Sequence, residues 1–126
     1  MRRLLLDTNV VVWLLLGERA SVTDAAREAL EDESNSVSVS AVSVWEIAIK
    51  RSLGKLDIED GWMKALERSA FDPMPITAIH AEHVERLPWL HRDPFDRMLI
   101  AQASTEAHAL VSAGPHLAAY GVDVVW

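Results

Sequence analysis

Residues 93–100, Asp-Pro-Phe-Asp-Arg-Met-Leu-Ile, are the stretch from which the fold of this 126-residue sequence can be worked out. Asp93 followed by Pro94 is typical of a helix N-cap with proline at the first helical position. Asp96 then falls in the first turn, on the same face as Asp93 and near the positive end of the helix dipole. Two interpretations are open: the two acids only start a helix, or they also belong to a charged site.

Two further acids interrupt apolar segments elsewhere in the chain. Asp7 ends the apolar run of residues 4–6, and Glu46 lies inside the apolar segment 42–49. A carboxylate among apolar neighbours carries a desolvation cost that a partner such as a cation must offset. Oxygen ligands suit Mg²⁺ or Mn²⁺. Since there is neither a glycine-rich phosphate loop nor a G-x-S-x-G turn, these acids favour metal-assisted hydrolysis.

The order of the predicted elements indicates an α/β fold with a mainly parallel sheet and helices on both faces. Strands are predicted at 3–6, 36–40, 109–112 and 122–125, with a short extended piece at 74–76. Helices are predicted at 24–33, 41–53, 60–70, 77–87 and 94–108. Residues 10–16 are apolar all round, so periodicity does not decide between helix and strand. Ligands of such sheets bind beyond the carboxyl ends of the strands, where Asp7 would lie.

Length and composition limit the class of protein. With half of its residues hydrophobic, the chain suits one domain, residues 1–126. There is no cysteine, which excludes disulfides, thiolate zinc sites and a catalytic thiol. Asp7 breaks the first apolar run and no run approaches the roughly 18 apolar residues of a membrane span, so we expect a soluble cytoplasmic protein. The net charge of −7 argues against nucleic-acid binding unless metal ions or a basic partner supply positive charge.

Several other side chains allow two interpretations. His80 and His83 lie one helical turn apart but lack a third metal ligand, and we expect them at the surface. Trp13 and Trp45, beside the acids, could be core residues or could form an exposed groove for a partner segment. The two arginines near the acids, Arg92 and Arg97, could hold phosphate or pair with neighbouring carboxylates.

Three segments together resemble the successive motifs of PIN-domain nucleases, and VapC-type toxins most of all. They are Leu-Leu-Leu-Asp-Thr-Asn at 4–9, Ser-Val-Trp-Glu-Ile-Ala-Ile-Lys at 43–50, and the stretch from His91 to Ala103. The resemblance implies an α/β/α sandwich, Mg²⁺- or Mn²⁺-dependent endoribonuclease activity on RNA, a homodimer and neutralisation by a cognate antitoxin. It also implies that Asp7, Glu46 and Asp96 are the metal-binding and catalytic acids.

The resemblance assigns supporting positions as well. Asp93 would lie near the metal as a further ligand candidate while keeping its cap role. The expected polar supports of the site are Thr8, Asn9 and Ser112.

The sequence departs from the family pattern in the last motif, where an acid usually follows Thr or Ser and a small residue. This chain has Ser112-Ala113-Gly114, so the position that would supply a further metal ligand carries no carboxylate. Glycine there could instead serve a tight turn with an unusual backbone angle.

Two other functions are therefore kept as alternatives. One is a PIN-like binding module without catalysis. The other is a haloacid-dehalogenase-like phosphatase with Asp7 as nucleophile, although the second acid of that family would fall at Asn9.

Overall fold

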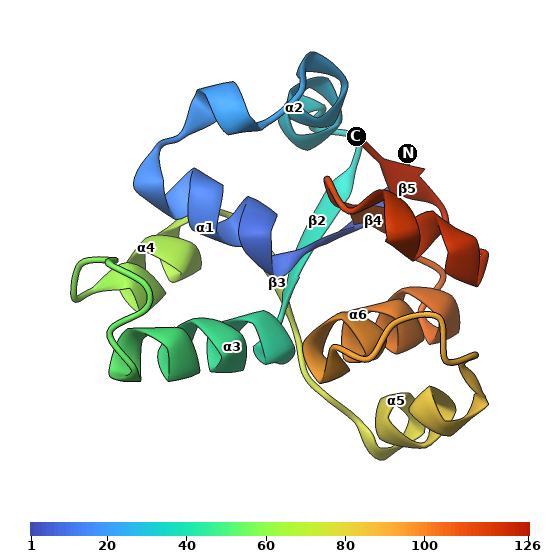
Figure 1. Cartoon of the computed structure of the whole chain (residues 1–126). Helices are drawn as coiled ribbons and strands as arrows, with labels where there is room; N and C mark the ends of the chain where they lie inside the picture. The colour runs from blue at the N-terminus through green and yellow to red at the C-terminus, as the bar shows by residue number, and fades with distance from the viewer.

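A five-stranded sheet in which all neighbouring strands are parallel forms the centre of the computed structural model, which describes residues 1–126 (Figure 1). The strands lie in the order β3-β2-β1-β4-β5. Their bounds are Arg3–Leu6 (β1), Ser36–Ser40 (β2), Asp72–Met74 (β3), Ala109–Val111 (β4) and Val124–Val125 (β5).

Helices cover both faces of this sheet. They are α1 (Thr8–Leu16), α2 (Asp24–Glu31), α3 (Ala41–Ser52), α4 (Trp62–Arg68), α5 (Ala78–His83) and α6 (Pro94–Thr105), with short 3-10 turns at Arg19–Ser21, Val84–Arg86 and Pro115–Tyr120. Figure 1 shows α1, α2 and α4 on one side of the strands and α5 and α6 on the other. The predicted α/β/α sandwich is confirmed. None of the helices has the length and apolar character needed to cross a membrane.

The central strand β1 contributes to the hydrophobic layers on both faces. Leu4, Leu5 and Leu6 are fully buried. Leu4 and Leu6 pack with residues of α1 and α2, whereas Leu5 packs with residues of α6. Because successive strand side chains point to opposite faces, a central strand covered on both sides requires this uninterrupted apolar run.

Residues 10–16, which periodicity leaves undecided, belong to helix α1. A further strand could pair with β1 only at one of its edges, and both edges are already paired, with β2 and β4. Residues 10–16 therefore cannot lie beside β1 as a strand, and the chain leaves the sheet after Leu6. Val10 and Val11 are buried, whereas Leu14 and Leu16 are exposed. Gly17, with φ of 69°, then ends the helix.

The short strand after α4 lies two residues earlier than predicted. Instead of residues 74–76, the strand is β3, in which Pro73 pairs with Val39 of β2. β3 lies at the edge of the sheet, where proline is tolerated because its missing N–H can face outward. The positions of the prolines in the sequence do not indicate that Pro73 pairs with Val39.

His80 is buried, so the prediction that it lies at the surface is wrong. Its Nδ1 accepts the backbone N–H of Thr77 at 3.1 Å, and its Nε2 lies 2.8 Å from Oε1 of Glu106. Thr77 in turn caps the start of α5 through the backbone N–H of His80. Both ring nitrogens therefore have structural partners.

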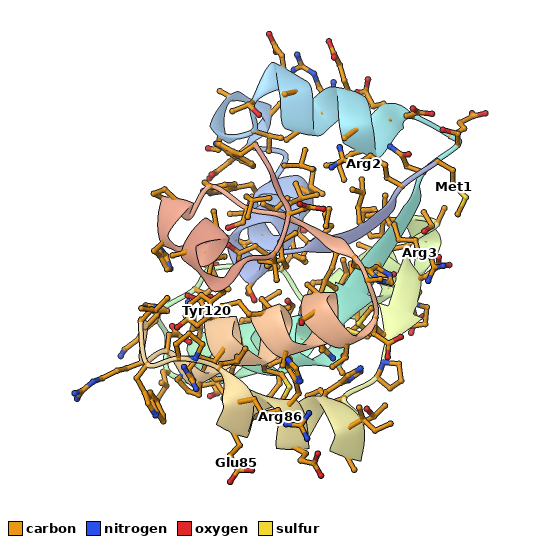
Figure 2. The ribbon with its side chains drawn as sticks, turned by 90° about the vertical axis from the view of Figure 1, so that its right-hand side faces the viewer. Met1, Arg2, Arg3, Glu85, Arg86 and Tyr120 are labelled. Carbon is orange, nitrogen blue, oxygen red and sulfur yellow. The ribbon has the colours of Figure 1, made fainter.

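The carboxyl ends of β1 and β2 lead directly into helices and so define one edge of the sheet. Asp7 lies between β1 and α1, and Ser40 ends β2 and caps α3. Helix α3 contacts both α1 and α6. Arg2 and Arg3, labelled in Figure 2, lie at the opposite end of β1. The candidate acids are therefore separated from these basic residues by the length of the strand.

Candidate metal centre

Asp7 is a buried candidate acid, with 7% of its surface exposed. Burial raises the pKa of its carboxyl above the ordinary value of 3.8, and the negative charges of Asp96 and Glu46 raise it further. The Ser112 hydroxyl and the Thr8 backbone N–H act in the opposite direction by hydrogen bonding to the carboxylate. Asp96 and Glu46, from distant parts of the sequence, are thus close enough to Asp7 to raise its pKa.

Glu46 lies in the middle of α3 and is also 7% exposed. Its Oε2 pairs with Nζ of Lys50 at 2.9 Å, one helical turn later. Lys50 partly offsets the charge of the buried carboxylate. Lys50 is not a predicted site residue, although the spacing of four residues on a predicted helix indicates such a pair.

Asp96 lies in the first turn of α6 with its carboxylate between two histidines. Its Oδ2 is 2.9 Å from Nε2 of His91 and 3.6 Å from Nε2 of His116. Neither histidine is a predicted site residue. His91 belongs to the same motif as Asp96, but His116 follows the departure at Gly114 and nothing in the local sequence links it to α6.

The cap predicted at the start of α6 is present. Oδ1 of Asp93 accepts the backbone N–H groups of Phe95 at 2.8 Å and of Asp96 at 3.2 Å, with Pro94 as the first helical residue. Asp93 therefore has a defined structural role and holds Asp96 at the helix start.

The predicted polar supports have different environments. The Ser112 hydroxyl donates to Oδ2 of Asp7 at 2.6 Å and accepts the N–H of Gly114 at 3.0 Å. The Thr8 and Ser43 hydroxyls share a buried hydrogen bond of 2.9 Å, which ties α1 to α3. Asn9 is exposed. Ser112 is thus the support that acts on Asp7 directly.

Gly114 does not adopt the unusual backbone angle that the turn interpretation requires. Its φ is −80° and its ψ is 102°, which residues with side chains adopt freely. A Cβ at this position would lie 3.0 Å from Cε1 of His116 and 3.4 Å from Oγ of Ser112. The absence of a side chain therefore matters for the space around His116 and not for the backbone.

The two arginines have unlike environments. Arg92 is exposed, whereas Arg97 is 2% exposed. The Arg97 guanidinium lies 3.9 Å from the centre of the Trp89 ring and donates to carbonyl oxygens in the preceding segment, those of Val84, Leu87, Pro88 and His91. Neither predicted role of Arg97, phosphate contact or pairing with an acid, agrees with this geometry, because Nη1 and Nη2 donate to backbone carbonyls and the side chain is buried away from the acids; Nε is buried without a hydrogen-bond partner.

The tryptophans near the acids also differ. Trp13 is partly buried and lies 5.7 Å from Trp126 between ring centres, as a core residue would. Trp45 is 56% exposed and meets Phe95 edge to face at 5.1 Å. The core interpretation is therefore wrong for Trp45, which presents an aromatic surface next to Glu46.

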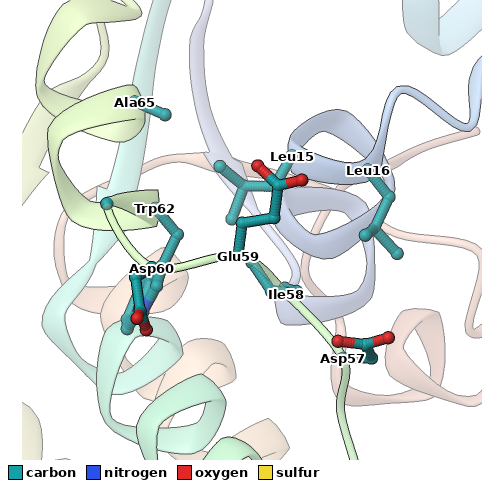
Figure 3. Close-up of a pocket in the computed structure, with 9 residues that line it drawn as sticks. Leu15, Leu16, Asp57, Ile58, Glu59, Asp60, Trp62 and Ala65 are labelled. Carbon is teal, nitrogen blue, oxygen red and sulfur yellow. The ribbon is translucent and has the colours of Figure 1, made fainter.

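A hollow of about 490 Å³ lies elsewhere, between the end of α1 and the start of α4 (Figure 3). It is lined by Leu15, Leu16, Asp57, Ile58, Glu59, Asp60, Gly61, Trp62 and Ala65. None of the candidate acids lines it, and Asp60 is already paired with Arg51 at 2.8 Å. This hollow is separate from the candidate centre.

Removing the Ser112 hydroxyl tests the electrostatics of the site. Ser112→Ala is expected to raise the pKa of Asp7 further, because a hydrogen bond that favours the carboxylate is lost. It should also lower the free energy of unfolding by about 1 kcal/mol. A carbon-13 NMR titration of the Asp7 carboxyl measures the pKa. Ser104→Ala, at an exposed position of α6, is the control, and an equal Asp7 pKa in both variants would contradict the assignment.

Comparisons with known proteins agree on the fold. A family model described as PIN domain matches residues 4–122. VapBC2 from Rickettsia felis, bound to a DNA fragment from their promoter, is 14% identical with a TM-score of 0.71, over 97% of this chain and 96% of that chain. DNA-bound VapBC from Salmonella typhimurium is 16% identical with a TM-score of 0.70, over 98% and 97%. FitAcB from Neisseria gonorrhoeae is 20% identical with a TM-score of 0.59, over 96% and 95%. No curated protein matches the chain in sequence.

Proposed function

Because the chain belongs to the PIN-domain family, we propose that it is a metal-dependent endoribonuclease acting as the VapC-type toxin of a toxin–antitoxin pair. The observation that carries the proposal is the coupling of Asp7, Glu46 and Asp96 at the carboxyl end of β1. Buried acids that repel one another are stabilised when a cation lies between them. RNA is the proposed substrate and the cytoplasm the proposed location.

The donor set fits Mg²⁺, with Mn²⁺ as the alternative. Asp7, Glu46 and Asp96 offer carboxylate oxygens, which hard cations prefer, and Mg²⁺ needs only one or two protein carboxylates. When bound, such an ion supplies positive charge that stabilises a phosphodiester during attack by water.

The chain's own residues prepare this centre. Ser112 holds the Asp7 carboxylate by a hydrogen bond, and Lys50 pairs with Glu46. Asp93 fixes the start of α6 and with it the position of Asp96. Exposed Arg92 remains a proposed contact for RNA phosphate, and Asp93 a further ligand candidate.

The direct test is cleavage of structured RNAs by the purified protein with Mg²⁺, with Mn²⁺ and with a chelator. We expect cleavage with either ion and none with the chelator. A folded protein that binds RNA but cleaves none with either ion would favour the binding module. Phosphate release from a small phosphomonoester, without RNA cleavage, would favour the phosphatase.

The proposed partner is an antitoxin with a basic segment. The chain carries a net charge of −7, and exposed Trp45, in contact with the partly buried Phe95, presents an aromatic surface beside Glu46 that an amphipathic segment could cover. Expression of the chain alone should arrest growth and co-expression of the antitoxin should restore it. A homodimer is the proposed assembly, and light scattering on the purified protein tests it.

Gly114→Asp is expected to reach half-maximal cleavage at about tenfold lower Mg²⁺ concentration, because an added carboxylate strengthens cation binding. The backbone accepts the substitution, and the exposed His116 side chain can move away from the new Cβ. The free energy of unfolding should therefore change by less than about 1 kcal/mol. Gly114→Asn adds a side chain of the same shape without charge and is the matched control. An equal Mg²⁺ titration for both variants would refute the role of charge at this position.

A further inference from the structure

Two histidines and one carboxylate converge at the start of α6. Nε2 of His91, Oδ2 of Asp96 and Nε2 of His116 offer three ligating atoms that lie within 4.8 Å of one another. They come from the segment before α6, from its first turn, and from the 3-10 turn Pro115–Tyr120. Residues separated in sequence are thus brought to one point by the fold.

The distances between these atoms suit a single metal ion. The carboxylate oxygen is 2.9 Å from one histidine nitrogen and 3.6 Å from the other. Ligands of a tetrahedral Zn²⁺ site, at about 2.0–2.1 Å from the ion, are separated by roughly 3.3 Å. The two observed distances lie on either side of this value.

The backbone around His91 is held in place by other elements. Its carbonyl oxygen accepts from the Tyr120 hydroxyl at 3.4 Å and from Nη1 of Arg97 at 3.5 Å. Tyr120, labelled in Figure 2, ends the same 3-10 turn that carries His116. The segments bearing the two histidines are therefore connected to each other and to α6.

Gly114 leaves the space that His116 needs. A side chain at residue 114 would bring its Cβ to 3.0 Å from the His116 ring, so the ring would have to move by a few tenths of an ångström from its observed position. The departure at Gly114 thus removes a carboxylate and makes room for an imidazole two residues later.

We propose that His91, Asp96 and His116 bind a divalent transition-metal ion, with Zn²⁺ as the expected occupant. Imidazole nitrogen suits Zn²⁺ and related ions and is a poor ligand for Mg²⁺. Three protein ligands leave a fourth position open, and the 48% exposed side chain of His116 puts that position within reach of solvent. The site shares Asp96 with the proposed acidic centre but does not depend on the chain being a nuclease.

The test is Zn²⁺ binding by the full chain after treatment with a chelator, measured by calorimetry without RNA. We expect one equivalent to bind, and His116→Ala to weaken its affinity by about tenfold or more. Co²⁺ used as a spectroscopic probe should give visible absorption that the variant loses. His83→Ala, on α5 and outside the cluster, is the matched control and should bind like the unaltered chain.

Equal Zn²⁺ affinity in the unaltered chain and in His116→Ala would overturn the proposal, as would displacement of Zn²⁺ by an equal concentration of Mg²⁺. If His91→Ala unfolds, His116→Ala still gives the answer, because His116 is half exposed on a surface turn. If the chain binds Zn²⁺ through these residues but cleaves no RNA, the Zn²⁺ site is supported and the proposed nuclease function is refuted. If the chain cleaves RNA with Mg²⁺ but binds no Zn²⁺, the nuclease function is supported and the Zn²⁺ site is refuted.

Discussion

Asp7→Asn is expected to lower RNA cleavage by about a thousandfold or more while making the metal-free protein more stable at neutral pH. The loss of cleavage follows from the loss of one of three coupled carboxylates. The gain in stability follows from the cost of keeping a charge in a buried position next to Asp96 and Glu46. Asparagine has the same shape and can still accept the hydrogen bond from Ser112.

The direction of the pH dependence follows from the raised pKa of Asp7. The native state keeps the Asp7 proton to a higher pH than the unfolded chain, whose carboxyl titrates near the ordinary value of 3.8. The contribution of this group to stability is therefore fully present below 3.8 and is lost as pH rises through the native pKa. The advantage of Asp7→Asn should grow across this window and stay constant above it.

Urea unfolding at several pH values with a chelator present measures this effect. Asp57→Asn, which changes an exposed acid away from the candidate centre, is the control and should leave both cleavage and its pH dependence unaltered. An Asp7→Asn variant that cleaves RNA like the unaltered chain at limiting Mg²⁺ would refute the catalytic assignment. A variant less stable than the unaltered chain at neutral pH would refute the electrostatic argument.

Arg97→Ala is expected to lower the free energy of unfolding by about 3–5 kcal/mol, the largest stability effect anticipated in this chain. The substitution leaves up to four carbonyl oxygens of the segment before α6 without their donor and removes the stacking against Trp89. Arg97→Lys should lose much of the same energy, because an ammonium cannot reproduce the planar, forked donation of a guanidinium.

Arg92→Ala is the matched control, since Arg92 is a neighbouring arginine with an exposed side chain. Its substitution should change the free energy of unfolding by less than about 0.5 kcal/mol. Urea unfolding of the three variants makes the comparison, and if Arg97→Ala is too unstable to purify, Arg97→Lys provides the measurement. Similar losses for Arg97→Ala and Arg92→Ala would contradict the structural role.

Local signals in the sequence were sufficient where a single segment determines its own structure. The cap at Asp93 is one example, because the N–H groups that it accepts belong to the residues that follow it. The alternating strand Ser36–Ser40 and the uniformly apolar β1 are recognisable from their own residue patterns, although their hydrogen bonds come from other strands. The family resemblance, and not periodicity, indicated which acids meet. Their closeness depends on tertiary packing, because Asp7 lies between β1 and α1, and α3, which carries Glu46, contacts both α1 and α6.

The predictions that failed concern side chains whose environment is formed by distant segments. Arg97 stands among acids in the sequence, yet its guanidinium is turned toward the backbone of the preceding segment. His80 is buried where α5 packs against α6, and its ring meets Glu106, 26 positions later. His116 meets Asp96 only because the last 3-10 turn lies against the start of α6. No local pattern contains these contacts.

The hydrogen bond between Ser112 and Asp7 joins residues 105 positions apart. During synthesis, Asp7 leaves the ribosome long before β4, which pairs with β1 and precedes Ser112. Closing such a large loop is among the slow steps of folding. A nascent chain that has not reached β4 therefore carries Asp7 without its hydrogen bond from Ser112, and a fragment that stops before β4 should not assemble the candidate centre.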